Sequence, residues 1–206
     1  MATKKTATET ITGAHGNSEI TFTIKSLTPC LMHNNTGVDP LHPLTREMKK
    51  ITGKRKKTDE DHELMSNIEY QQGIYHDEGV GPYWPGENIE AMVLSAAKMT
   101  RDGQKSKFGI WCKDFKAPLQ YDGPRDLASL IADPRFCDRR AARVKENRVM
   151  RTRPRFDNWL LTFTLGFKAE IFDRETVIDI VKKAGEYVGL SDGRPRYGQF
   201  QVIEAK

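Results

Sequence analysis

Arginine is concentrated in one short segment of the sequence. Between Arg135 and Arg155 there are nine Lys or Arg residues and only two acids, Asp138 and Glu146. Eight of the nine are arginines, whose planar guanidinium group binds phosphate through paired hydrogen bonds and stacks on nucleobases. The segment therefore favours an anionic polymer as partner, although a charge run can also be a solvated face that is paired with acidic neighbours. The candidate nucleic-acid-binding residues in it are Arg139, Arg140, Arg143, Lys145, Arg148, Arg151 and Arg153.

A second candidate phosphate site lies at residues 189–198, which we call the glycine loop. It combines glycines, arginines and a tyrosine, namely Gly189, Gly193, Gly198, Arg194, Arg196 and Tyr197. Glycines allow positive φ and let backbone N–H groups approach an anion, while the arginines supply charge and the tyrosine offers a stacking plane. The alternative is a helix C-cap followed by a turn, with Tyr197 packed on the core. The neighbouring arginine-rich segment favours the binding interpretation.

A third basic cluster is the run Lys54, Arg55, Lys56 and Lys57. A polybasic run suits phosphate contact from a flexible arm. It can equally be neutralised by Asp59 to Asp61, which follow at once.

The residue types needed for catalysis do not form a convincing pattern. His33, His42, His62 and His76 match no metal-binding spacing, and scattered surface histidines are the favoured interpretation. No nucleophile with an adjacent base and no paired carboxylates stand out. We therefore expect no metal site and no cofactor.

The elements that must position these residues follow from hydrophobic periodicity. Alternation predicts a strand over 19–25, and Thr58 is predicted to cap a helix with Leu64, Met65 and Ile68 facing inward. A short hairpin is expected over 73–84, a helix after Pro85, and a hairpin in which Ala141–Met150 pairs with Trp159–Phe167. The chain should close with a helix capped by Asp173 and a strand over 200–203. Without insertions this order is strand, helix, hairpin, helix, strand, which predicts an α+β, ferredoxin-like (RRM-like) βαββαβ core.

Length and composition bound the class of protein. The chain has 206 residues, a net charge of +5 and 37% hydrophobic residues, which suits one domain with a sizeable core. We expect a flexible tail over 1–18 and a single domain over 19–206, with an insertion at about 39–81 and a basic hairpin region at about 135–167. The three cysteines are odd in number and far apart, and no stretch is apolar enough to span a membrane. These features predict a cytoplasmic protein.

Two stretches of the sequence resemble a known superfamily. Gly81-Pro82-Tyr83-Trp84-Pro85-Gly86-Glu87-Asn88-Ile89-Glu90-Ala91-Met92 looks like the proline-glycine helix start of the RAMP superfamily, the crRNA-binding backbone-type subunits of CRISPR effector complexes. Gly189-Leu190-Ser191-Asp192-Gly193-Arg194-Pro195-Arg196-Tyr197-Gly198-Gln199-Phe200 is similar to the glycine-rich loop near the C-terminus of that superfamily. The overall pattern, with His33-Asn34-Asn35 and Thr58-Asp59-Glu60-Asp61, also looks like uncharacterised bacteriophage-encoded proteins.

The resemblance implies a ferredoxin-like core that binds single-stranded RNA, or a similar strand, and assembles side by side along it. Our leading hypothesis is therefore a non-catalytic single-stranded nucleic-acid-binding protein that prefers RNA and forms a homo-oligomer or filament on it. The first alternative is a metal-dependent endoribonuclease, because some RAMP subunits cut target RNA with a loop aspartate and Asp39 is similar in place. The second is a phage-carried mimic that binds CRISPR effector subunits and blocks their assembly.

Overall fold

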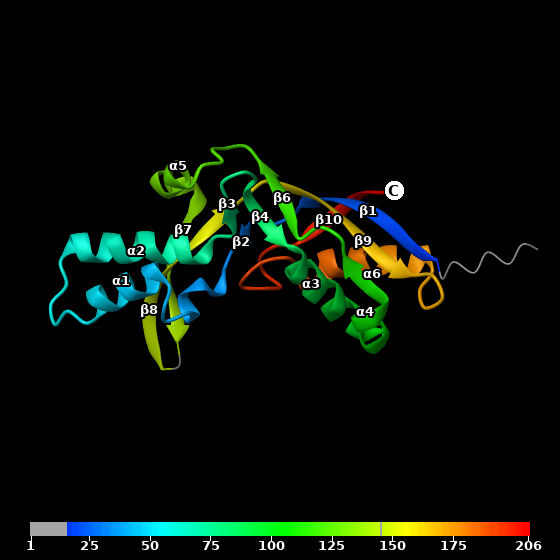
Figure 1. Ribbon diagram of the computed structural model, residues 1–206, viewed down its shortest axis with the longest axis horizontal. Coiled ribbons are helices and arrows are strands. Elements are labelled where there is room, and N and C mark those ends of the chain that lie inside the picture. Colours follow the sequence, from blue (N-terminus) through cyan, green and yellow to red (C-terminus); the bar gives the residue numbers. More distant parts are fainter. Residues whose placement is uncertain (1–15, 145) are drawn as a thin grey trace, which may run out of the picture.

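The computed structural model describes residues 16–144 and 146–206, and they form an α+β fold (Figure 1). The strands are β1 (Asn17–Ser26), β2 (Cys30–Leu31), β3 (His76–Asp77), β4 (Gly81–Pro85), β5 (Ile110–Cys112), β6 (Lys116–Tyr121), β7 (Cys137–Val144), β8 (Asn147–Phe156), β9 (Trp159–Lys168) and β10 (Phe200–Ala205). The helices are α1 (Pro43–Thr52), α2 (Asp59–Gly73), α3 (Gly86–Met99), α4 (Gly103–Gly109), α5 (Leu127–Ala132) and α6 (Arg174–Lys183), with short helical turns at Asn35–Val38, Pro134–Phe136 and Ala184–Val188.

The larger sheet has the strand order β10-β1-β9-β6-β4-β3, with β5 also pairing with β9, and all of its pairs are antiparallel. Alternate residues of β1 point to opposite faces. Ile20, Phe22 and Ile24 are fully buried, whereas Thr21 and Thr23 lie on the other face and contact threonine hydroxyls of β9. The sheet is therefore apolar on one face and polar on the other.

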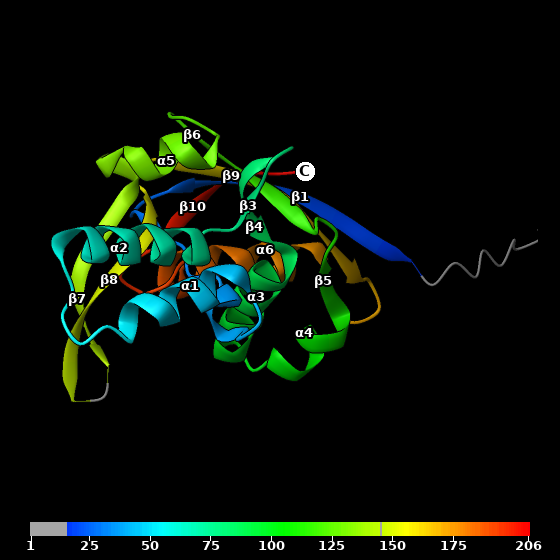
Figure 2. The ribbon, with the colours of Figure 1, turned by 60° about the vertical axis from the view of Figure 1, so that its left-hand side comes forward.

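Helices α3 and α6 cover the apolar face, below the sheet in both ribbon views (Figures 1 and 2). The helix expected after Pro85 is present as α3, and its apolar stripe of Ile89, Met92, Val93 and Ala96 is buried. The stripe of α6 contributes Val177, Ile180 and Val181 in the same way. Helix α6 of this layer leads into the glycine loop, and β10 of the sheet follows it.

The expected pairing of Ala141–Met150 with Trp159–Phe167 is wrong. Strand β8 turns back on β7, with Val144 opposite Asn147, and these two strands form a separate three-stranded sheet with β2. Strand β9 instead lies between β1 and β6 in the larger sheet. The physical reason is burial: β9 carries Trp159, Phe163 and other apolar side chains that need the main core, whereas eight of the 18 residues of β7 and β8 are charged.

Helices α1 and α2 lie beside this hairpin at one end of the molecule, away from α4 (Figures 1 and 2). Helix α2 packs on β8, and Ile68 is buried as predicted. Leu64, expected to face inward, is 41% exposed, because the buried face of this helix runs through Asp61 and Ile68, and Met65 is half-buried. The strand expected from Glu19 starts at Asn17, and the rest of the expected tail, residues 1–15, lies outside the described residues. No helix among the described residues is long and apolar enough to cross a membrane.

Thr58 caps α2 as predicted. Its hydroxyl accepts a hydrogen bond from the Asp61 N–H (3.3 Å), and the Asp61 carboxylate accepts one from the Thr58 N–H (3.2 Å). Lys54 Nζ lies 2.6 Å from the same carboxylate, and this contact, followed by the bond from the Thr58 backbone, lowers the pKa of Asp61. The cap thus ties the start of α2 to the basic run.

Replacing Thr58 by alanine is expected to lower the free energy of unfolding by about 1 kcal/mol, because it removes an acceptor from the first turn of α2. Urea denaturation followed by circular dichroism measures the change. The control is Thr52→Ala, which removes an exposed hydroxyl that bonds only to the Lys49 carbonyl within its own helix. Equal stability of the two variants would contradict the cap.

Candidate nucleic-acid interface

The glycine loop follows α6 and its helical extension directly. Gly189, Gly193 and Gly198 have φ angles of +80°, +74° and +76°, so the prediction that they adopt positive φ is confirmed. In this region an L-side chain is strained, which explains why the sequence places glycine at each position.

Backbone hydrogen bonds hold the glycine loop in a fixed shape. The Leu190 N–H donates to the Gly198 carbonyl across the loop (2.8 Å), and the Gly198 N–H donates to the Pro29 carbonyl (2.8 Å). The Asp192 N–H donates to the Leu31 carbonyl (2.8 Å), whose own N–H donates to Ser191 Oγ (2.7 Å). The segment of β2 therefore carries the loop on one side and, through its pairing with β8, the arginine-rich hairpin on the other.

The loop and the hairpin touch each other. Arg153 Nε lies 2.5 Å from Asp192 Oδ2. The Arg140 guanidinium lies over the Tyr197 ring, 5.1 Å from its centroid, and donates to the Tyr197 hydroxyl. Arg196 lies 5.9 Å from the centroid of the same ring. Two predicted sites that are far apart in the sequence are thus adjacent, and we call them together the hairpin–loop surface. It comprises Arg139, Arg140, Arg148, Arg151 and Arg153 of the hairpin and Gly193, Arg194, Arg196 and Tyr197 of the loop.

Three of these arginines are paired with acids, as the alternative interpretation of the charge run expects. Arg140 pairs with Asp138, Arg151 Nη1 lies 2.7 Å from Glu69 Oε1 of α2, and Arg153 pairs with Asp192. The bond to Asp138, and then the one to Tyr197, raises the pKa of Arg140 above its ordinary value. These arginines hold the hairpin against α2 and the glycine loop, which is a structural role.

The other arginines of the surface are exposed and make no ion pair within the described residues. They are Arg139, Arg148, Arg194 and Arg196. Arg143 lies on β7, and Lys145 lies outside the described residues. In the basic run, Lys54 pairs with Asp61 and Lys57 donates to the Lys54 carbonyl (3.2 Å), whereas Arg55 and Lys56 are exposed and unpaired within the described chain. The unpaired cations are the ones available to phosphate.

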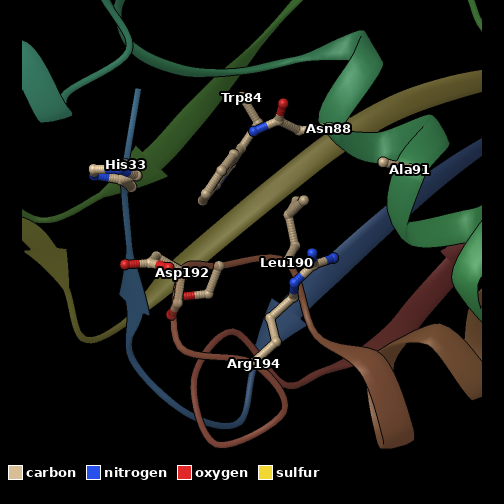
Figure 3. A pocket seen from close by; sticks show the side chains of 8 residues that line it. His33, Trp84, Asn88, Ala91, Leu190, Asp192 and Arg194 are labelled. Atoms are coloured by element: carbon tan, nitrogen blue, oxygen red, sulfur yellow. The ribbon is translucent and has the colours of Figure 1, made fainter. Parts of the chain in front are cut away.

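A cavity of about 210 Å³ lies between α3 and the glycine loop (Figure 3). Its lining combines His33, which follows β2, with Trp84, Asn88 and Ala91 of the proline-glycine stretch and Leu190, Ser191, Asp192 and Arg194 of the loop. A neighbouring hollow of about 500 Å³ shares Ser191, Asp192 and Arg194 and extends to Ser95 and Tyr187. The two sequence stretches that carry the RAMP resemblance therefore meet around one cavity.

Sequence reasoning did not assign His33, Asn88 or Asp192 to a site. Trp84 is 2% exposed, so it belongs to the core, and the part of it that remains accessible lines the cavity. Tyr75 packs against Trp84, with ring centroids 5.8 Å apart. One feature of the sequence could have indicated this site: both stretches that resemble the RAMP superfamily contain polar residues close to a glycine.

Asp39 is exposed at the end of the short helical turn after Asn35, where its carboxylate accepts a hydrogen bond from the Leu41 N–H (2.9 Å). His42 Nδ1 caps α1 by accepting from Leu44 N (3.3 Å), and His76 Nε2 contacts the Arg125 carbonyl (2.8 Å). Among the described residues no three His, Cys, Asp or Glu side chains gather closely enough to hold a metal ion. No contact on the described chain supports the ribonuclease alternative.

These observations define the fold class of the protein as α+β, with a larger antiparallel sheet and a second, smaller sheet. The chain is similar in fold to a chain in the structure of the type III-B Cmr-beta bound to cognate target RNA, with a TM-score of 0.50 and 11% sequence identity. The match covers 92% of this chain and 60% of the other, so this chain spans less than two thirds of its neighbour's length. No family model matches the sequence, and no curated protein matches it.

Proposed function

We propose that this protein binds single-stranded RNA, without cleaving it, on the hairpin–loop surface. The observation that carries the proposal is that the arginine-rich hairpin and the glycine loop are in contact, through Arg140, Tyr197 and the Arg153–Asp192 pair, so that unpaired arginines of both segments belong to one rigid unit. Spaced guanidinium groups on a rigid support suit a chain of phosphates, which sequence-independent binding requires. The fold similarity to a chain of an RNA-bound Cmr complex agrees with this proposal.

A ferredoxin-like core of the RAMP type is part of the proposal. The strand order β10-β1-β9-β6, with α3 before β6 and α6 after β9, fits a βαββαβ unit. On this interpretation the chain is one domain, residues 39–81 form an insertion after the first strand, and the β7–β8 hairpin is a second insertion between the core strands β6 and β9. Both insertions lie at the same end of the core (Figure 1).

Tyr197 is proposed to orient cations rather than to stack bases itself. Its half-buried ring is contacted by Arg140 and Arg196. Guanidinium groups held against an aromatic ring have fewer rotamers to lose when they bind phosphate or stack on a base.

The test is fluorescence polarisation at low salt with labelled 20-nucleotide single-stranded RNA, single-stranded DNA and duplex RNA, with a denaturing gel run in magnesium. We expect the tightest binding for single-stranded RNA and intact RNA on the gel. Absence of binding at low salt would overturn the proposal. Cleavage that is lost in Asp39→Ala would establish the ribonuclease alternative instead.

Assembly along the strand is proposed to depend on the basic run, whose exposed Arg55 and Lys56 project from the insertion. Binding should be cooperative on a 40-nucleotide strand, because neighbouring copies share it, and weak on a 10-nucleotide strand. The variant Arg55→Gln with Lys56→Gln should lose cooperativity and keep one-site binding. Lys49→Gln with Lys50→Gln, on α1, is the matched control. Equal affinity per site for both lengths would contradict assembly.

A further inference from the structure

We propose that the cavity between α3 and the glycine loop is a nucleotide pocket that takes one unstacked base carrying an exocyclic amino group, with the attached phosphate at Arg194. The pocket gives the proposed RNA-binding surface a base preference, so this inference rests on that function for its strand. The same chemistry can be supplied by a free nucleotide, and the experiment below distinguishes the two sources.

The cavity has apolar walls that suit the faces of an aromatic ring. Trp84 and Leu190 contribute the edges that remain accessible in the cavity, since each is only 2% exposed, and the exposed Ala91 of α3 adds a small apolar side chain to the lining (Figure 3). A volume of about 210 Å³ has room for one ring system and too little for two stacked nucleotides. A single base is therefore the natural occupant.

Hydrogen bonds orient the polar groups of the pocket before any ligand binds. Asn88 Nδ2 donates to the Tyr75 hydroxyl (3.3 Å), which itself donates to the His33 carbonyl (3.3 Å). These two hydrogen bonds leave Asn88 Oδ1 as an acceptor with no partner among the described residues. Asp192 is fixed through its N–H and through Oδ2, which is paired with Arg153, so its Oδ1 is a second open acceptor.

Two acceptors, one of them a carboxylate oxygen, select for N–H donors. Cytosine, adenine and guanine present an exocyclic amino group, whereas uracil presents a carbonyl oxygen at the corresponding position of the pyrimidine ring. A buried acceptor that faces a carbonyl is left without a partner, which costs binding free energy. Cytosine should therefore bind better than uracil, although the two rings have nearly the same size.

Arg194 supplies the charge for the phosphate. It lines both the 210 Å³ cavity and the larger hollow next to it, together with Ser191 and Asp192. A base in the first space therefore has its phosphate beside the guanidinium, and the strand can continue along the second space toward Tyr187. The pocket is open at the point where the hairpin–loop surface begins.

The first arm of the experiment is calorimetric titration with CMP and UMP. We expect CMP to bind at least about 10-fold more tightly than UMP. Ala91→Leu, which fills the cavity, should abolish CMP binding, whereas Ala128→Leu, an exposed alanine on α5 outside the cavity, should leave it unchanged. Arg194→Gln should weaken CMP binding about 10-fold, and Arg46→Gln, at an exposed arginine of α1 outside both the cavity and the hairpin–loop surface, should not.

The second arm uses 12-nucleotide strands of oligo(C) and oligo(U). Ala91→Leu should lower the affinity for oligo(C) about 10-fold and leave that for oligo(U) unchanged. If CMP binds and neither oligonucleotide does, the pocket binds free nucleotides and the proposed binding of single-stranded RNA is refuted. If both strands bind but Ala91→Leu changes neither, and CMP does not bind, the pocket is refuted while the strand function stands.

Discussion

Simultaneous replacement of Arg139, Arg148, Arg194 and Arg196 by glutamine is expected to weaken single-stranded RNA binding by about 100-fold at low salt. The four side chains are exposed and make no ion pair within the described residues, so their charge is available to phosphate. An exposed charge contact contributes up to about 1 kcal/mol, and about 3 kcal/mol for the four corresponds to about two orders of magnitude in Kd. The slope of log K against log salt should fall by about 3, since each phosphate contact contributes about 0.7 for a single strand.

A matched control separates specific contact from net charge. Lys98, Lys107, Lys168 and Lys182, replaced together by glutamine, remove the same charge from α3, α4, β9 and α6, outside the hairpin–loop surface. This variant should keep most of the salt slope. Equal slopes for the two quadruple variants would show that the hairpin and loop arginines serve only as solvated surface.

Stability provides a second contrast within the same surface. Arg151 and Arg153 hold Glu69 of α2 and Asp192 of the loop, so their replacement by glutamine should alter stability as well as binding. Replacement of the four unpaired arginines by glutamine should leave the free energy of unfolding nearly unchanged. Comparing the stability of these variants would therefore distinguish the arginines that stabilise the fold from those that bind RNA.

Gly198→Ala is expected to lower the free energy of unfolding by about 3 kcal/mol and to weaken RNA binding as the loop loses its shape. The residue has a φ of +76°, and a Cβ there would lie 2.4 Å from the Leu190 carbonyl oxygen and 2.5 Å from Ser191 Cβ. Backbone strain of this kind costs about 1–3 kcal/mol, and the contact with a backbone oxygen cannot be relieved by moving a flexible side chain. The Gly198 bonds to Leu190 and Pro29 would be disturbed together.

Urea denaturation of Gly198→Ala against Gly79→Ala checks this result. Gly79 lies in the turn between β3 and β4, where a Cβ would meet nothing closer than the Asp77 carboxylate at 3.4 Å. Its replacement should change stability by less than about 0.5 kcal/mol. If the two alanine variants unfold at the same urea concentration, the loop is not held in the way that its hydrogen bonds indicate.

Features that depend on neighbouring residues could be predicted from the sequence. The Thr58 cap, the apolar stripe of α3 and the positive φ of the glycine-loop residues each follow from a few adjacent side chains, and each is present. Local signals of this kind are set by capping, periodicity and backbone freedom, which a single sequence displays directly.

Features that depend on distant residues could not be predicted. The strand expected over Ala141–Met150 spans the end of β7 and the start of β8, and β9 pairs instead with β1, which lies near the start of the chain. Glu69 and Asp192 neutralise Arg151 and Arg153 from positions that no local pattern connects with them. The cavity is lined from three separated parts of the chain, so its volume and its open acceptors emerge only when those parts are packed together.

The position of β1 in the larger sheet bears on the order in which the protein can fold during synthesis. In the described chain β1 pairs with β9 and β10, both of which come after Phe156. The backbone N–H and C=O groups of β1 therefore cannot pair until most of the chain has been synthesised. The β7–β8 hairpin with α2 needs only residues that emerge earlier. Loop closure over such a distance is slow, and an unpaired β-prone strand is exposed meanwhile. The arginine-rich hairpin is therefore expected to take shape on the ribosome before the sheet that carries it, with Trp159 and the residues after it completing the core last.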